Sequence, residues 1–316
     1  MTHMATRSDA ALSALLLTSR IVDVDAPALS PKEYWELIRQ VESPEKLLGR
    51  TSAEIASSFD LEPQRAERIA SRLSGATQLA FALERLDQQG YRVLTSFDEG
   101  YPTRLVDRLG DQAPPSITAV GSVELLSSQA IGLVGSRNAT DEAISVAEAV
   151  AAAAAGRGLG VVSGGAKGVD QRSMAAAFQA GGSVVGWLAE SLEKRLRDPE
   201  TRRVVGDGSV CLATPFKPDA GFSVANAMSR NKLIYASARA TLVVACDPGA
   251  GGTWEGAVES LRRGYGTVAV WAGTGAGPGN EALLARGGLS VGSTQELFDL
   301  PTDPVRSPRA QLSLEL

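Results

Sequence analysis

Histidine and cysteine are almost absent from this chain of 316 residues. His3 is the one histidine, and Cys211 and Cys246 are the two cysteines, each within or beside an apolar segment. Zinc sites need clusters of these ligands at short spacing, so the sequence predicts no metal site. Two isolated thiols in apolar surroundings are typical of a reducing compartment, and we expect a cytoplasmic protein.

The chain also lacks an excess of basic charge and any long hydrophobic run. It has 31 Lys and Arg against 36 Asp and Glu, which gives a net charge of -5. This net charge weighs against a nucleic-acid binder that works through overall charge, although a local basic cleft remains compatible with it. The longest run of small residues, 143–160, contains Glu148 and Arg157, which excludes a membrane span there. No membrane partner is expected.

What is abundant is glycine, 33 residues, in a chain long enough for two domains. Residues 1–88 carry helix signals only. Ser30 and Thr51 are each followed three positions later by a glutamate, the spacing of a capping box. We predict short helices within 10–17, from the capping signal at Ser30 through about residue 41, and at 55–59, 61–73 and 76–88. This small all-helical domain resembles a helix-hairpin-helix or SAM-like module, for which we favour a packing role over direct DNA binding.

From residue 131 onward, short apolar runs alternate with helical segments. Strands are predicted at 131–135, 159–163, 183–188, 209–213, 241–245 and 267–271. Helices are predicted at 141–155, 171–179, 192–205, 227–238 and 253–263. Continuous apolar strands are expected when helices cover both faces of a parallel sheet. The fold class is therefore α/β, an extended Rossmann-like, doubly wound and mostly parallel sheet over 89–300, with 301–316 as a disordered tail.

Glycine-containing turns follow three of these strands, at 135–137, 163–170 and 249–255. A strand that turns into a helix exposes backbone N–H groups at a positive helix end, so three such turns at one sheet edge predict an anion site. The ligand would be a nucleotide or a nucleic-acid backbone. The candidate phosphate-binding residues are Gly135, Ser136, Arg137, Ser163, Gly164, Gly165, Lys167, Gly168, Arg230, Asn231, Lys232, Gly251, Gly252 and Thr253.

The spacing within these turns excludes two common nucleotide motifs. Neither the P-loop pattern nor the Gly-x-Gly-x-x-Gly dinucleotide pattern is present, and we expect no cofactor. Arg230 and Lys232 lie near the start of a predicted helix, and both are expected to face the anion site. Glu255 begins another helix, where it either complements the helix dipole or acts as an acid or base. Asp170 is expected to have a structural role.

Taken in order, these motifs resemble the DprA/Smf family (DNA processing protein A) over about residues 91–300. The resemblance rests on Tyr101-Pro102, Pro114-Pro115 and the segments 134–137, 163–170, 229–234 and 249–253. It implies an extended Rossmann fold, single-stranded DNA binding without catalysis, a homodimer, and RecA as a partner in transformation or recombination. It also implies that Arg137, Lys167 and Arg230 contact DNA, with Lys232 beside them. The chain would be a divergent member without a C-terminal winged helix.

Two alternatives remain open at this point. Residues 228–232 and 248–255 also resemble the LOG phosphoribohydrolases, which are lysine-decarboxylase-like enzymes that cleave nucleoside monophosphates. That resemblance implies a nucleotide N-glycosidase in which Arg230 and Glu255 are catalytic, although Gly256 occupies the position of the usual second glutamate. The other alternative is a nucleotide-sensing domain of a defence or stress pathway, which would bind a nucleotide without converting it.

Overall fold

The computed structural model describes residues 7–22 and 24–301, and it begins with a group of short helices. Their bounds are α1 Asp9–Thr18, α2 Pro31–Val41, the 3-10 turn η1 Pro44–Leu47, α3 Ser52–Phe59, α4 Pro63–Leu73 and α5 Ala76–Gln88. Both predicted capping boxes form, at Ser30 with Glu33 and at Thr51 with Glu54. Each box satisfies free N–H groups at a helix start, so local sequence fixes where α2 and α3 begin.

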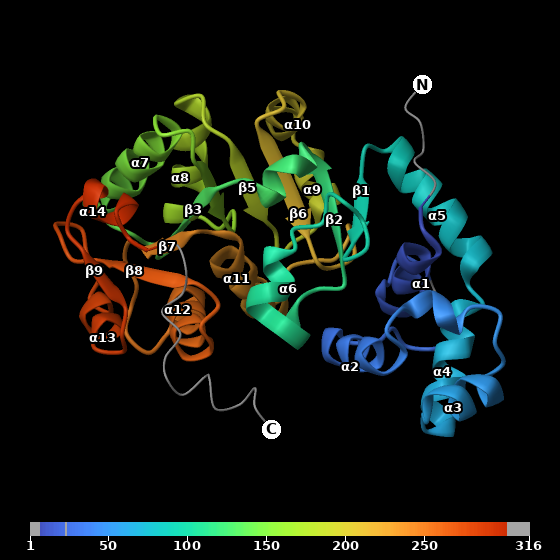
Figure 1. Cartoon of the computed structure of the whole chain (residues 1–316). Helices are drawn as coiled ribbons and strands as arrows, with labels where there is room; N and C mark the ends of the chain where they lie inside the picture. Colours follow the sequence, from blue (N-terminus) through green and yellow to red (C-terminus); the bar gives the residue numbers. More distant parts are fainter. Residues whose placement is uncertain (1–6, 23, 302–316) are drawn as a thin grey trace.

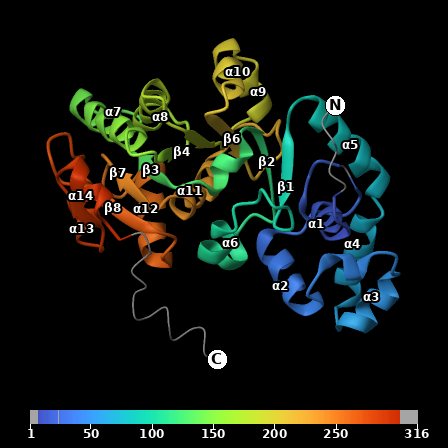
Figure 2. The same cartoon turned by 45° about the horizontal axis from the view of Figure 1, so that its top comes forward.

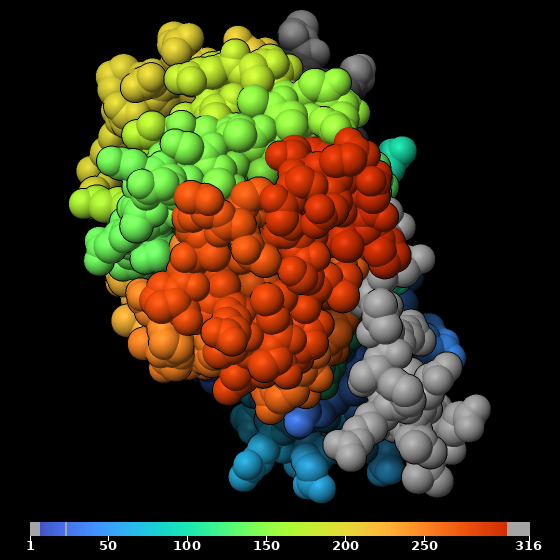
Figure 3. Space-filling model, turned by 90° about the vertical axis from the view of Figure 1, so that its left-hand side faces the viewer, coloured from blue at the N-terminus to red at the C-terminus, as the bar shows by residue number. Residues whose placement is uncertain are grey.

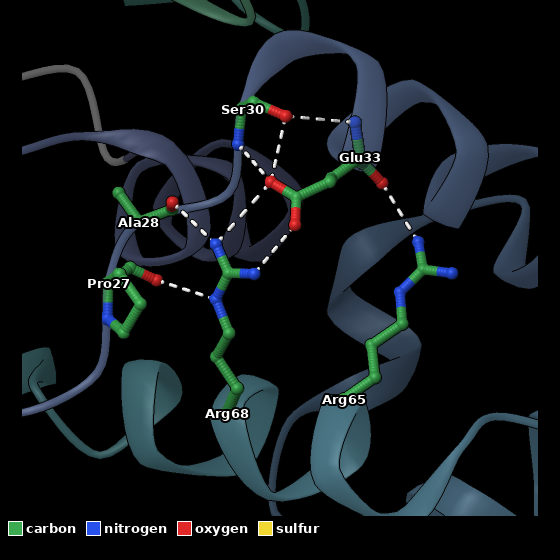
Figure 4. A network of polar contacts seen from close by, with 6 residues as sticks. All are labelled: Pro27, Ala28, Ser30, Glu33, Arg65 and Arg68. Carbon is green, nitrogen blue, oxygen red and sulfur yellow. Dashed lines mark hydrogen bonds and ion pairs between the residues drawn. The ribbon is translucent and has the colours of Figure 1, made fainter.

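Two arginines of α4 hold the helical region together. Arg72 is buried, and it donates hydrogen bonds to the carbonyl oxygens of Leu16, Ser19 and Ala26. Arg68 binds the carboxylate of Glu33 at 2.6 Å and the carbonyl oxygens of residues 27 and 28 (Figure 4). These contacts join α4 to α1, to α2 and to the segment between them.

The remaining chain builds a nine-stranded sheet. Its strands are β1 Arg92–Thr95, β2 Ser116–Gly121, β3 Ala130–Val134, β4 Gly160–Ser163, β5 Val184–Trp187, β6 Val210–Thr214, β7 Ala240–Val243, β8 Thr267–Trp271 and β9 Leu289–Val291. The order across the sheet is β1-β2-β6-β5-β4-β3-β7-β8-β9. β2 pairs antiparallel with both β1 and β6, and the other pairs are parallel. The prediction of a mostly parallel, Rossmann-like sheet is confirmed.

Helices cover both faces of this sheet (Figure 1). Their bounds are α6 Arg104–Leu109, the 3-10 turns η2 Gly110–Gln112 and η3 Val123–Ser127, α7 Asp141–Ala155, α8 Val169–Gln179, α11 Val224–Ser237, α12 Gly251–Arg263 and α13 Asn280–Leu284. Ile131 and Leu133 of β3 pack in one hydrophobic cluster with α7, whereas Val134 packs in another with α11 and α12. Side chains that alternate along one strand therefore serve two separate core layers.

Two parts of the α/β region differ from the sequence prediction. The helix predicted at 192–205 is two helices, α9 Leu192–Leu196 and α10 Pro199–Gly206, because Pro199 cannot continue a helix from the residues before it. β9 and α14 Thr294–Phe298 were not predicted at all. α14 packs on α7, and the red C-terminal segment lies beside the green one in Figure 3. Arg157 lies 4.3 Å from the ring of Phe298 and donates to Gln295. Of the predicted tail, residues 302–316 lie outside the described residues.

The helical region lies beyond the β1 edge of the sheet in both cartoon views (Figures 1 and 2). The hydrophobic cluster that contains Leu16 of α1 and Leu79 of α5 also contains Val93 and Val120 of the sheet. Trp35 of α2 donates to the carbonyl oxygen of Ala113 at 2.9 Å. The domain boundary at residue 88 remains a prediction, because apolar packing crosses it. No helix among residues 7–22 and 24–301 combines the length and the hydropathy that crossing a bilayer would need.

Candidate nucleic-acid interface

The sheet reverses its winding direction between β3 and β7. The chain runs outward from β3 through β4, β5 and β6, and then returns to add β7 on the other side of β3. Ligands of doubly wound folds bind outside the carboxyl ends of the strands at this switch point, because the loops on either side diverge there. A cavity of about 390 Å³ occupies the switch point in this chain.

Eight of the fourteen predicted site residues line this cavity, which we call the switch-point cleft. They come from the turn after β3, from α11 and from the start of α12, and they are Gly135, Ser136, Arg137, Arg230, Asn231, Gly251, Gly252 and Thr253. The structure brings these eight residues together in one cavity. Their contact with a phosphate remains a prediction.

Arg230 is the most unusual side chain of the cleft. It is only 5% exposed, and its Nε and Nη1 atoms are buried without a hydrogen-bond partner. The guanidinium lies against the backbone of Gly164, where a Cβ atom would overlap Nη1. A buried guanidinium with unused donors is costly, because each missing hydrogen bond leaves a desolvation penalty uncompensated. Such a group is suited to an anion that completes its hydrogen bonds.

Asp170 supplies the charge that balances Arg230. It is 5% exposed, and its Oδ2 atom accepts the backbone N–H of Gly164 at 3.2 Å. Burial raises the pKa of this carboxyl, and the nearby Arg230 opposes that rise. Burial likewise lowers the pKa of Arg230, and Asp170 opposes that change. No direct ion pair joins the two within the described chain, so the guanidinium keeps hydrogen-bonding capacity.

Hydrogen bonds between the turns fix the shape of the cleft. Thr253 donates from Oγ1 to the carbonyl oxygen of Gly135 at 2.9 Å, which joins the third turn to the first. Asn231 donates from Nδ2 to the carbonyl oxygen of Gly252 at 2.8 Å, which joins α11 to α12. Ser136 donates its N–H to the carbonyl oxygen of Ala245, which follows β7. The site is therefore preorganised, and a ligand would not have to order these loops.

The residues of the second turn mainly contact other parts of the protein. Ser163 is fully buried and donates to the carbonyl oxygen of Leu133 at 2.6 Å. Gly164 makes room for Arg230, and Gly168 packs against the backbone of the first turn. The carbonyl oxygen of Gly165 accepts from Arg195 and Gln171. Gly164, one of the candidate phosphate-binding residues, therefore leaves space for the side chain of Arg230.

Lys167 and Lys232 complete the set of predicted basic residues. Lys167 is exposed on the second turn and does not line the switch-point cleft. Lys232 is part of the other face of α11, where its Nζ atom donates to Gln112 Oε1 at 3.4 Å. The prediction that Lys232 faces the same cleft as Arg230 is wrong. Residues two positions apart on a helix point in different directions, so only one of the two can line this cleft.

The sequence analysis did not predict an aromatic residue that lies at the cleft. Phe222 is 55% exposed, and the guanidinium carbon of Arg137 lies 5.7 Å from the centre of its ring. Both residues line the cleft. An exposed aromatic ring is a platform on which a nucleobase can stack. The available signal was a pair of phenylalanines, Phe216 and Phe222, in the glycine- and proline-containing segment between β6 and α11.

Of the two residues that the hydrolase alternative would use, Arg230 lines the cleft and Glu255 does not. Glu255 is exposed and is not part of the cleft lining, while Gly256 is the neighbouring position that faces Asn231. Burial raises the pKa of the Cys246 thiol to about 11, which disfavours a thiolate nucleophile. Trp254 is buried with Arg286 against its ring, so it packs and offers no free face. Among the described residues, no group of His, Cys, Asp and Glu could hold a metal.

Comparison with known proteins agrees with this geometry. Residues 92–299 match the family of DNA recombination-mediator protein A. Protein Smf of Synechocystis sp. is 27% identical over 195 residues, 58% of this chain and 47% of Smf, so the chain spans about half of that relative's length.

Two solved structures share the fold. DNA processing protein A (DprA) of Streptococcus pneumoniae superposes with a TM-score of 0.64 at 20% identity, over 86% of this chain and 98% of that one. DNA processing protein A of Helicobacter pylori is described for its single-stranded DNA binding mode. It superposes with a TM-score of 0.54 at 19% identity, over 65% of this chain and 93% of that one. The family match covers most of the chain and includes every turn of the cleft. The chain therefore belongs to the DNA recombination-mediator protein A family, also called DprA/Smf.

Proposed function

We propose that this protein binds single-stranded DNA in the switch-point cleft and acts by binding, without catalysis. The observation that carries the proposal is Arg230, a buried guanidinium with two unpartnered nitrogens in the lining of a preorganised cleft. A backbone phosphate would satisfy it, while Arg137 supplies a second cation and Phe222 a stacking surface. Contacts of this kind read no base sequence, so binding would be independent of sequence.

The experiment is a fluorescence-anisotropy titration of labelled oligo-dT at several salt concentrations. We expect wild-type affinity to fall steeply with salt, and Arg137→Ala to reduce the slope of log K against log salt by about 0.7, the value for one phosphate of a single strand. Lys167→Ala should reduce the slope less, because Lys167 lies outside the cleft lining.

Arg262→Ala is the matched control, because it removes an exposed charge from the far end of the helix whose start lines the cleft. Wild-type protein that binds no oligonucleotide at low salt would refute the proposal. Stoichiometric binding of a mononucleotide in its place would favour the nucleotide sensor, and release of free base that requires Glu255 would favour the hydrolase.

The finer parts of the family resemblance belong to the same proposal. A homodimer in the cytoplasm would present two clefts and deliver bound strands to RecA. Family membership supports this part of the proposal. Light scattering would measure the mass in solution, and co-precipitation with purified RecA, with and without oligo-dT, would test the delivery step.

A further inference from the structure

A second and larger cavity lies on the opposite face of α11 from the switch-point cleft. Its volume is about 630 Å³, and we call it the lateral groove. The end of α1 and the start of α2 form one wall, β2 with Pro114 and Pro115 forms the floor, and the segment after β6 together with α11 forms the other wall. The groove therefore exists only because the helical region packs beside the sheet.

The charge of the lateral groove is opposite to that of the whole chain. Arg20, Lys217 and Lys232 line it, and none of the lining residues that the structure describes is Asp or Glu. The chain as a whole carries a net charge of -5, and even the switch-point cleft contains Asp170 and Asp247. Cations that gather in a concave surface create a local positive potential, which attracts a polyanion.

The charge of Lys232 is destabilised by burial. Burial lowers the pKa of its ammonium group, and Glu259 and Asp111 oppose that change from outside the groove lining. Within the described chain no salt bridge joins Lys232 to either of them, and its ammonium group donates a hydrogen bond of 3.4 Å to Gln112. A desolvated cation without a carboxylate partner is unfavourable, and an anion in the groove would relieve it.

α11 separates the two cavities. Ala225, Asn226, Ser229 and Lys232 line the lateral groove, whereas residues 224, 227, 228, 230 and 231 line the switch-point cleft. Both cavities reach the first turn of α11 and the loop before it, through Lys217 and Ala220 on one side and Phe222 on the other. A helix with side chains is only about 10–12 Å across, so a short stretch of extended chain spans it.

We propose that a bound DNA strand continues from the switch-point cleft over the first turn of α11 into the lateral groove. This inference rests on the proposed function and adds a second stretch of strand to it. Arg20, Lys217 and Lys232 would contact backbone phosphates, and the half-buried ring of Phe216 would contact bases. Continuity with the cleft is the reason for choosing a nucleic-acid strand over an acidic peptide as the occupant.

The test compares two oligo-dT lengths, about 6 and about 20 nucleotides, which bracket usual site sizes for single-strand binders. The variant is Arg20→Glu/Lys217→Glu, and Lys232→Gln is examined separately because that side chain is partly buried. For the double variant we expect unchanged affinity for the short oligonucleotide. For the long one we expect at least a tenfold loss, together with a smaller salt slope by about 1.4, the effect of two phosphate contacts. Lys232→Gln should give a smaller loss in the same direction.

Arg203→Glu/Arg262→Glu is the control, with the same charge change on exposed helices away from the groove. Equal losses of affinity for both oligonucleotides, or no loss for the long one, would overturn the proposal that the strand continues into the lateral groove. Unchanged binding of the long strand together with loss of poly-glutamate binding would assign the groove to an acidic protein and would also overturn it. Failure of wild type to bind either oligonucleotide would refute the proposed function itself, so the two failures are distinguishable.

Discussion

Gly164 and Arg230 occupy one space: the guanidinium of Arg230 fills the position that a side chain at residue 164 would take. The two residues come from different elements, the turn after β4 and helix α11. Asp170 links them, because its carboxylate accepts the N–H of Gly164 and faces the charge of Arg230. The glycine thus acts on the ligand site indirectly, by allowing a cation to be buried beside it.

Gly164→Ala should displace Arg230 and weaken both stability and DNA binding. We expect a loss of about 1–3 kcal/mol in the free energy of unfolding, the usual cost of overpacking a well-packed site. Urea denaturation measures the first effect and oligo-dT anisotropy the second. Gly206→Ala is the control, because that helical glycine has nothing within 4 Å and alanine is the better helix former. Wild-type stability and affinity in Gly164→Ala would contradict the packing argument.

Asp170→Asn should change how stability depends on pH. Burial raises the pKa of Asp170 above its ordinary value of 3.8, so the folded state holds the proton more tightly than the unfolded state. The stability from this group is complete below pH 3.8 and is lost as pH rises through the folded pKa. Compared with wild type, Asp170→Asn should therefore become progressively more stable from about pH 4 upward.

Urea denaturation at several pH values between about 4 and 8 measures this difference in the free energy of unfolding. Asp219→Asn, an exposed carboxylate on the loop before α11, is the control and should show no such trend. The opposite trend would mean that attraction to Arg230 outweighs desolvation, so that the ionised carboxylate stabilises the fold.

Phe222→Ala and Arg137→Ala should weaken DNA binding in distinguishable ways. Loss of a stacking ring costs about 1–3 kcal/mol of binding free energy and releases no counterions, so the salt slope should stay at its wild-type value. Loss of Arg137 should reduce that slope, because one phosphate is no longer neutralised. Phe81→Ala, which removes an exposed ring from α5, is the control. A reduced slope in Phe222→Ala would show that the ring acts by positioning Arg137.

Glu33→Gln should reduce acid sensitivity within the helical region. The hydrogen bond from Arg68 lowers the pKa of Glu33 from 4.5 to about 2. The stability it contributes is therefore present above pH 4.5 and is lost as pH falls through about 2. The variant should be less stable than wild type at neutral pH, and the difference should shrink on acidification.

Thermal unfolding between about pH 2 and pH 6 follows this difference. Glu36→Gln, on the same helix but in an exposed pair of 3.8 Å with Lys32, is the control and should show little effect at any pH. A difference between Glu33→Gln and wild type that persists at pH 2 would mean that Glu33 acts through packing and not through its charge.

The sequence predicted those features that depend on neighbouring residues. Capping boxes at Ser30 and Thr51, apolar runs for the parallel strands and glycine-containing turns after them all formed as predicted. Two of the wrong predictions have local causes that are visible in the sequence. Pro199 interrupts a predicted helix, and a spacing of two residues could not place Arg230 and Lys232 on one helical face.

Other features depend on residues that meet only in the folded chain. That Gly164 accommodates Arg230 follows from the packing of α11 against β4, which no local pattern encodes. The lateral groove depends on how the helical region docks beside β1 and β2, and the charges that line it are dispersed from Arg20 to Lys232. β9 has three residues and an exposed centre, too short to give an apolar pattern.

The pairing of β3 with β7 brings together residues far apart along the chain, such as Ile131 and Ala240. Contacts of this kind form late in folding, because a long loop must close before they give any stabilisation. The first and third turns, which Thr253 joins, meet only after that closure. A nascent chain that has not yet made β7 and the turn after it therefore has no switch-point cleft.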